Sequence, residues 1–240
     1  MLEIQKAPVV STGWTRRAYD EIYRQAGICQ LDSFYQWILS LLRPVPGRRL
    51  LDVSCGQGVL VRMARQAGLE AHGLDLSEMA VRIAKEEEGR ALVVGNGERL
   101  PYPNGIFDYV TNIGSLEHFL DMAAGVREMA RVLAPDGLAC ILLPNTYSLL
   151  GNVWSAFRRG VTLDDGQPLQ RYAARREWQA LLEAHGFRVE GVVKYEREWP
   201  HSWADVRWYL RHPRPLIHLL LTPFIPLNLA SCFVYLCRRR

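Results

Sequence analysis

Cysteine is scarce in this chain and follows no functional pattern. Five cysteines occur in 240 residues, with no CxxC pair and no spacing typical of metal ligands. This excludes a small disulfide-stabilised scaffold, predicts no metal site and makes a reducing, cytoplasmic compartment the simplest expectation. The opening MLEIQKAPVV has no basic region followed by an apolar run, so we expect no signal peptide.

Charge of one sign is not in clear excess either. The 29 basic and 25 acidic residues give a formal net charge of +4. No cluster of Lys and Arg marks one face, so we expect no nucleic-acid partner. Repeats and low-complexity tracts are missing, and 49% of the residues are apolar, which is enough for a sizeable buried core. These features are typical of a folded globular domain.

What the sequence does contain is a regular alternation of short apolar runs and helical stretches between residues 49 and 143. The expected strands are Arg49–Val53, Glu70–Leu74, Ala91–Val94, Phe107–Thr111 and Leu138–Leu143. The expected helices are Gly58–Ala67, Ser77–Glu88 and Asp121–Leu133, the last two opened by Ser77 and Asp121 as N-caps. Strands joined through single helices run parallel, so this order predicts an α/β fold with a doubly wound sheet.

The rest of the chain is expected to flank this sheet. Residues 1–48 would form an N-terminal helical cover and 49–240 the main domain, with 145–175 and 199–228 as insertions on the substrate side. Further helices are expected at Trp14–Gln25, Leu31–Leu42 and Arg175–Ala184, and further strands at Arg188–Lys194 and Ser231–Leu236.

A glycine-rich turn, Ser54-Cys55-Gly56-Gln57-Gly58, follows the first expected strand. Glycines let the backbone approach a ligand closely, and free N–H groups at the start of a helix favour negative groups. The dinucleotide fingerprint Gly-x-Gly-x-x-Gly/Ala is not met, because Val61 takes its third position, and Asp52 would repel a pyrophosphate. An NAD-dependent oxidoreductase is therefore the weaker interpretation.

Polar groups also follow the next two strands. Asp75 ends the second strand, 17 residues beyond Gly58, where a carboxylate can accept hydrogen bonds from both hydroxyls of a ribose. Asn96, Gly97 and Glu98 follow the third strand. Because the carboxyl ends of parallel strands meet at one edge of such a sheet, these turns predict one shared ligand site.

The run from Leu50 to Pro144 resembles the class I S-adenosylmethionine-dependent methyltransferases, in particular the small-molecule group called type 11 or UbiE-like. The matching segments are LDVSCGQG, GLDLSEMAV, GNGERLPYPNGIFDYV, SLEHFLD and REMARVLAPDGLACILLPN. The resemblance implies a Rossmann-like, mainly parallel seven-stranded sheet with an antiparallel last strand. It also implies S-adenosylmethionine as cofactor, S-adenosylhomocysteine as product, and direct in-line displacement.

The resemblance assigns one group of residues to the methionine and ribose parts of the cofactor. The turn around the methionine part would be formed by Asp52, Ser54, Gly56 and Gly58. Asp75 would bind the ribose hydroxyls, and Leu76 would pack on the adenine.

A second group would complete the cofactor site. Asn96 would accept a hydrogen bond from the adenine amino group, with the Gly97 backbone beside it. Asn112 and Ile113 would lie near the sulfonium and the amino-acid moiety, and Tyr19 would close over the cofactor.

Two residues depart from the family pattern. Ser54 stands where the family has glycine, so the turn must avoid a positive φ there or accept strain. Asn96 replaces the usual aspartate and accepts a hydrogen bond without charge, which predicts weaker cofactor binding. Neither change removes a group that methyl transfer requires. An active enzyme is therefore expected, with a non-catalytic, cofactor-binding partner subunit as the alternative.

Glu117 and His118 are the candidate catalytic residues. They are expected to begin the helix after the fourth strand, where the acceptor should enter. His118 is a candidate general base because imidazole has an unperturbed pKa near neutrality, while a packing role at the helix start is an equal alternative.

The acceptor is expected to be a small or lipophilic biosynthetic intermediate. The apolar stretch Pro215–Cys237 is interrupted by Pro223 and Pro226, so a membrane-spanning helix is not expected. Residues 199–228 place tryptophans and arginines beside an apolar segment, which is typical of interfacial membrane contact. A hydrophobic acceptor pocket, a substrate cap or a homodimer contact are the alternatives there.

Overall fold

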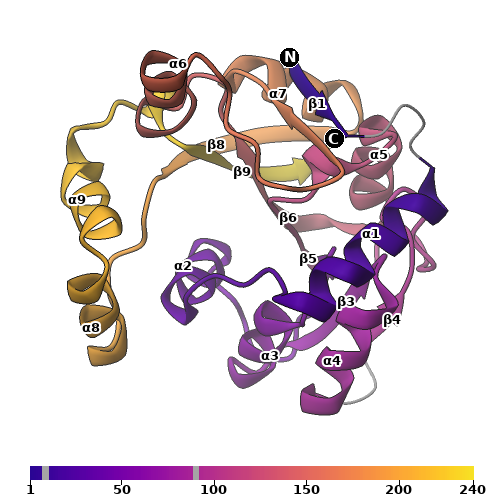
Figure 1. The fold of residues 1–240 in the computed structure, drawn as a ribbon. Helices are drawn as coiled ribbons and strands as arrows, with labels where there is room; N and C mark the ends of the chain where they lie inside the picture. Colours follow the sequence, from indigo (N-terminus) through magenta and orange to yellow (C-terminus); the bar gives the residue numbers. More distant parts are fainter. Residues whose placement is uncertain (7–10, 89–91) are drawn as a thin grey trace.

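The structure is a computed structural model that describes residues 1–6, 11–88 and 92–240. A seven-stranded sheet forms its centre, with helices on both faces (Figure 1). Its spatial order is β4-β3-β2-β5-β6-β9-β8. The strands are β2 (Arg49–Val53), β3 (Glu70–Asp75), β4 (Leu92–Val94), β5 (Phe107–Ile113), β6 (Leu133–Pro144), β8 (Phe187–Tyr195) and β9 (Cys232–Arg239).

The strand directions confirm the predicted topology. The pairs β3/β4, β2/β3, β2/β5 and β5/β6 are parallel, whereas β9 is antiparallel to both of its neighbours, β6 and β8. The strand order reverses between β2 and β5, and ligands bind at the carboxyl ends of the strands beside such a reversal.

The helices of the described residues are α1 (Thr12–Gln25), α2 (Asp32–Leu42), α3 (Val59–Gln66), α4 (Glu78–Glu88), α5 (Met122–Val132), α6 (Trp154–Arg159), α7 (Arg175–Ala184), α8 (Trp203–Arg211) and α9 (Pro213–Leu221). Helices α2, α3, α4, α5 and α7 pack apolar residues against the sheet. One core includes Phe34 of α2, Leu60 of α3 and Val81 of α4, and the other includes Met129 of α5 and Trp178 of α7. No helix in the described ranges is long and apolar enough to cross a bilayer.

The predicted N-caps are confirmed. Asp121 accepts a hydrogen bond from the backbone N–H of Ala124 at 2.9 Å, and the Ser77 hydroxyl accepts one from Ala80 at 3.1 Å. Of the strand predicted at Ala91–Val94, Leu92–Val94 forms β4, and Ala91 lies outside the described residues.

Residues 1–48 are not purely helical. Strand β1 (Leu2–Gln5) pairs in antiparallel register with β7 (Leu169–Tyr172), which makes a second, two-stranded sheet. Both strands have four residues, and their partners are more than 160 residues apart, so neither has the long apolar run that would predict it. This ribbon attaches the start of the chain to the insertion 145–175.

Candidate functional site

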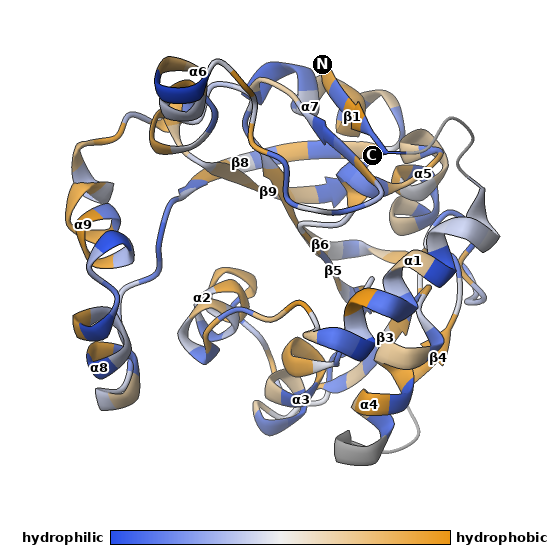
Figure 2. Ribbon diagram, viewed as in Figure 1, coloured by the Kyte–Doolittle hydropathy of each residue, from blue (hydrophilic) through white to orange (hydrophobic). Residues whose placement is uncertain are grey.

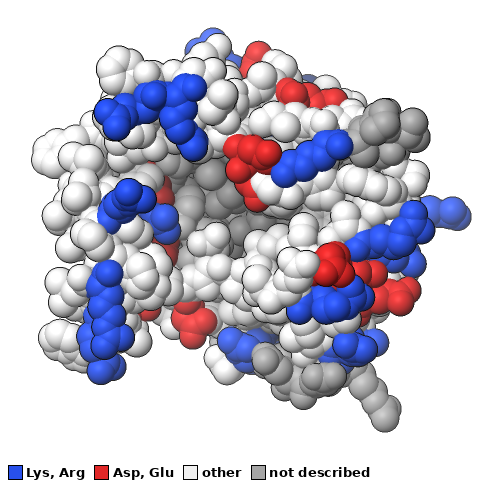
Figure 3. Space-filling view, in the orientation of Figure 1, with Lys and Arg blue, Asp and Glu red and all other residues white. Residues whose placement is uncertain are grey.

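A cavity of about 300 Å³ lies at the carboxyl ends of β2, β3 and β5, with residues of α1 in its wall. Ten of the predicted site residues line it: Tyr19, Asp52, Ser54, Gly56, Asp75, Leu76, Asn96, Gly97, Ile113 and His118. Gly58, Asn112 and Glu117 are not part of its wall. The face shown in Figure 3 is hollowed near its middle.

The turn after β2 has a left-handed backbone at three of its residues. Ser54 has φ +64°, Gly56 +53° and Gly58 +76°. At Gly56 a Cβ atom would lie 2.7 Å from the Tyr23 hydroxyl, so this glycine makes room for a ring of α1. Of the two possibilities expected for Ser54, avoiding a positive φ or accepting strain, the structure shows the second, at a cost of about 1 kcal/mol. Gly58 acts one step away from the cavity as the N-cap residue of α3.

Asp75 is buried in the cavity wall and held by the backbone. One carboxylate oxygen accepts from the N–H of Gly56 at 2.8 Å, and the other from the N–H of Ser77 at 2.8 Å. Burial raises the pKa of Asp75 to about 6, against these two hydrogen bonds, which lower it. Each oxygen keeps a further lone pair, so the group can still accept from a ligand.

Asp52 contributes a second buried carboxyl group. It accepts a hydrogen bond from the Thr111 hydroxyl of β5 at 2.6 Å. Burial raises its pKa to about 7, with a smaller contribution from the nearby charge of Asp75 and against the Thr111 hydrogen bond, which lowers it. A positive group in the cavity would offset both effects.

The turn after β4 is organised by its own side chains. The Asn96 side-chain oxygen accepts from the N–H of Glu98 at 2.9 Å. The Glu98 carboxylate in turn accepts from the N–H groups of Leu120 at 2.7 Å and Asp121 at 3.1 Å, which ties this turn to the segment after β5.

The side chain of Asn112 makes hydrogen bonds within the fold and does not line the cavity. Its amide donates to the carbonyl of Val53 at 3.0 Å and accepts from the N–H of Leu116 at 2.9 Å. The side chain is fully buried, so it joins β5 to β2 and shapes the next turn. Its neighbour Ile113 lines the cavity.

Glu117 and His118 do not begin a helix, which corrects the sequence prediction. They lie in a 3₁₀ turn, Leu116–His118, and α5 begins only at Met122 because Phe119 has an extended backbone and Asp121 is the N-cap. His118 thus lies in a separate turn before α5 and forms part of the cavity wall.

His118 has a defined tautomer. Its Nδ1 contacts the carbonyl oxygen of Leu169, which can only accept, so Nδ1 carries the proton. Nε2 lies 3.8 Å from Glu117 Oε1 and 3.8 Å from Asp165 Oδ2. Burial lowers the pKa of His118, and it raises the pKa of Glu117 to about 8. Both groups are therefore neutral near pH 7, and Nε2 is a free basic nitrogen.

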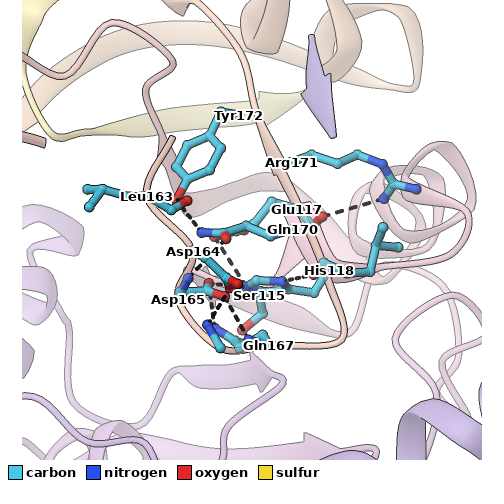
Figure 4. Close-up of polar contacts among 12 residues, drawn as sticks. Ser115, Glu117, His118, Leu163, Asp164, Asp165, Gln167, Gln170, Arg171 and Tyr172 are labelled. Atoms are coloured by element: carbon cyan, nitrogen blue, oxygen red, sulfur yellow. Dashed lines mark hydrogen bonds and ion pairs between the residues drawn. The ribbon is translucent and has the colours of Figure 1, made fainter. Parts of the chain in front are cut away.

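The β1–β7 ribbon holds this turn in place. Arg171 of β7 pairs with Glu3 of β1 at 2.6 Å and donates to the carbonyl oxygens of Glu117 and Phe119. Figure 4 shows Arg171 and Gln170 from the β7 strand beside Glu117 and His118.

Two polar residues of the segment 145–175 lie at the site although no sequence pattern pointed to them individually. Gln167 lines the cavity and accepts a hydrogen bond from the Tyr19 hydroxyl at 2.8 Å. Asp165, which accepts from the N–H of Gln167 at 2.8 Å, points to His118 (Figure 4). No motif marks them, because only the tertiary fold brings this loop to α1.

The opposite part of the wall is aromatic. Tyr195, at the end of β8, packs against Phe34 with ring centres 4.9 Å apart and stacks on Trp37 at 5.3 Å. Phe34, Tyr35 and Tyr195 line the cavity, as does Cys232 at the start of β9. An apolar acceptor fits this part better than a charged one.

The donor set fits S-adenosylmethionine, which carries a sulfonium and an ammonium group. Asp52, Asp75 and Glu98 line the cavity, and its described wall contains no Lys or Arg. A diphosphate would meet only like charge there, which disfavours NAD. The described residues also hold no group of His, Cys, Asp and Glu that could bind a metal ion.

Comparisons with known proteins find methyltransferases. Residues 51–141 match the family model of a methyltransferase domain. A demethylmenaquinone methyltransferase of Listeria welshimeri is 40% identical over 113 residues, which cover 43% of this chain and 48% of that protein. The nocamycin O-methyltransferase of Saccharothrix syringae is 31% identical over 182 residues, covering 72% and 65%. The chain thus spans about half the length of the demethylmenaquinone relatives it matches.

A solved structure shows the same fold. The S-adenosylmethionine-dependent methyltransferase of Mesorhizobium loti superposes with a TM-score of 0.62 at 18% identity, covering 86% of this chain and 98% of that one. The family model and the methyltransferase relatives identify the chain as a member of the class I S-adenosylmethionine-dependent methyltransferases, and the solved structure shows that the fold agrees.

Proposed function

We propose that the chain methylates a hydroxyl group of a small, lipophilic acceptor. His118 carries this proposal: it lines the cavity, its proton is fixed on Nδ1 by the Leu169 carbonyl, and Nε2 is left to take a proton. An oxygen acceptor of high pKa needs such a base, whereas nitrogen acceptors need less help.

S-adenosylmethionine, when bound, supplies a methyl group on a positive sulfur. The residues of the chain would bind the cofactor and orient it toward the acceptor. All three acidic residues line the cavity: Asp75 would accept from the ribose hydroxyls, and Asp52 and Glu98 would offset positive charge. Phe34, Tyr35 and Tyr195 would exclude water from the acceptor side. Their packing against the acceptor would hold it in line with the methyl group.

The test is methyl transfer from labelled S-adenosylmethionine to two matched acceptor panels, apolar phenols and enols in one and apolar amines in the other. We expect transfer to the hydroxyl panel. We expect His118→Asn, whose side-chain amide can still donate to the Leu169 carbonyl from the position of Nδ1, to lower kcat by about 10²–10⁴-fold.

Titration calorimetry with S-adenosylhomocysteine provides the control, since His118→Asn should bind it as the unchanged protein does. Transfer to amines alone, or an unchanged kcat in the variant, would contradict the proposed base. Binding without transfer to any acceptor would favour a non-catalytic partner subunit.

A further inference from the structure

Helices α6, α8 and α9 lie along one side of the molecule (Figures 1 and 2), and together with the turn after α9 they expose large apolar side chains. The three most exposed large apolar side chains of the described residues are all here, namely Trp203 (81%), Phe224 (81%) and Phe157 (78%). Trp154, Leu210 and Ile217 are also more than half exposed. We call this surface the aromatic rim. Single exposed apolar residues are ordinary, but a set of this size marks an interaction surface.

The aromatic rim is basic. Its exposed charged side chains are arginines: Arg158, Arg159, Arg207, Arg211 and Arg214. Figure 3 shows Lys and Arg along the edge where α6, α8 and α9 lie. Among the ion pairs of the described residues, none involves these five.

The segments that form this surface contain almost no acidic residues. The sequence has no Asp or Glu between residues 145 and 160, and only Asp205 between 199 and 230. Asp205 is 6% exposed and accepts from the N–H groups of His201 and Ser202 at the start of α8. The rim therefore presents uncompensated positive charge beside exposed aromatic rings.

We propose that the aromatic rim docks on an anionic lipid bilayer. Arginines bind headgroup phosphates, tryptophan prefers the headgroup level, and apolar side chains enter the acyl boundary. The nine residues of α8 and the nine of α9 are too few to span a bilayer, so the helices would lie in its surface. Charge complementarity favours this occupant over a second copy of the chain, whose rim would be equally positive.

The fold couples this surface to the cavity. Tyr195 and Cys232 pair across β8 and β9, both line the cavity, and α8 and α9 lie in the segment between them. Lys194 donates to the carbonyl oxygens of Thr222 at 2.8 Å and Ile225 at 2.7 Å, which fixes the end of α9 at the sheet. Docking would thus bring the cavity to acceptors dissolved in the bilayer, a consequence that rests on the lipophilic acceptor proposed above.

The experiment is co-sedimentation of the full chain with phosphatidylcholine vesicles, with and without a quarter of phosphatidylglycerol. We expect binding to the anionic vesicles that weakens with added salt. The triple variant Arg207→Gln, Arg211→Gln, Arg214→Gln should lose about 100-fold in partition coefficient, at about fivefold per arginine. Trp203→Ser with Phe224→Ser should lose binding as well.

The matched control replaces three exposed arginines elsewhere, Arg82→Gln, Arg99→Gln and Arg127→Gln, and should bind vesicles like the unchanged protein. Equal binding to both vesicle types, or an unaffected rim variant, would overturn the proposal. A third result would also overturn it: the protein does not bind vesicles, forms a dimer in sedimentation velocity, and loses that dimer in the variant with Trp203→Ser and Phe224→Ser. Since vesicle binding requires neither cofactor nor turnover, failure of the proposed function would leave this result intact.

Discussion

The two walls of the cavity are built in different ways. On the cofactor side the hydrogen bonds are local or join neighbouring strands and turns of the sheet: Ser77 to Asp75 and Glu98 to Asn96 span two residues, and Gly56 to Asp75 joins the turns after β2 and β3. On the acceptor side the contacts come from outside the seven-stranded sheet: His118 contacts Leu169, 51 residues away, and Arg171 donates to the carbonyl oxygen of Phe119, 52 residues away. A wall made by the sheet itself is fixed by the strand topology, whereas a wall assembled from inserted segments can change without disturbing the sheet.

The largest expected effect tests the cofactor wall. Asp75→Ala removes a buried carboxylate that is placed to accept two hydroxyl groups, and hydrogen bonds to a charged group contribute about 1.5–3 kcal/mol each. Binding of S-adenosylhomocysteine in calorimetry should weaken at least about 100-fold. The control Asp164→Ala, on the exposed loop of the acceptor side, should bind normally. Equal affinity in both variants would remove the distinction between the walls.

The next effect tests the acceptor wall. Tyr195→Ala removes the ring between Phe34 and Trp37, so the acceptor loses its apolar support. We expect kcat/KM for a lipophilic acceptor to fall roughly 10–100-fold, from the few kcal/mol that a buried ring contributes. Affinity for S-adenosylhomocysteine should change less than about twofold, because the residues expected to bind that ligand lie on the other wall of the cavity. Tyr195→Phe should restore turnover, and a comparable loss of both properties would show that the walls are not separable.

A smaller effect concerns pH. Asp75 has a pKa of about 6 and Asp52 of about 7 in the free protein, both raised by burial. Below these values the carboxyls are neutral and do not attract a cation, so affinity for S-adenosylmethionine should rise about tenfold between pH 5 and pH 8. The pKa values of both groups should fall in the complex by the same linkage. Asp52→Asn should flatten the upper part of this rise in calorimetry, and a fall in affinity with pH would contradict the assignment.

The smallest effect concerns the strained turn. Ser54→Gly relieves a left-handed φ and should raise the free energy of unfolding by about 0.5 kcal/mol, after subtracting the entropy cost of glycine. Urea denaturation measures it. Ser115→Gly, at φ −140°, relieves nothing and should lower stability slightly. Equal shifts in the two variants would mean that the turn stores no strain.

The same division explains what could be predicted from the sequence. Asp75 and Asn96 follow strands of the α/β alternation, so their placement at one edge of the sheet follows from topology alone. The parallel strand directions follow from the same alternation, and the antiparallel β9 is what the family resemblance implied for the last strand.

Asp165, Gln167 and Arg171 could not be predicted in the same way. They reach the site through β7, a four-residue strand whose partner β1 lies at the other end of the chain. His118 was a candidate from the sequence and lines the cavity, but the 3₁₀ turn that carries it was not predicted, because the extended backbone at Phe119 depends on contacts that the local sequence does not encode. The sequence predicts a side chain best where its partners are also its neighbours.

The position of β9 has a consequence for the order of folding. Its eight residues come last in the chain, yet they lie between β6 and β8, so β8 has no place in the sheet until β9 has paired with β6. During synthesis the edge of β6 must therefore wait with open N–H and C=O groups while α8 and α9 emerge. A nascent chain stopped before residue 232 would expose that apolar edge to aggregation.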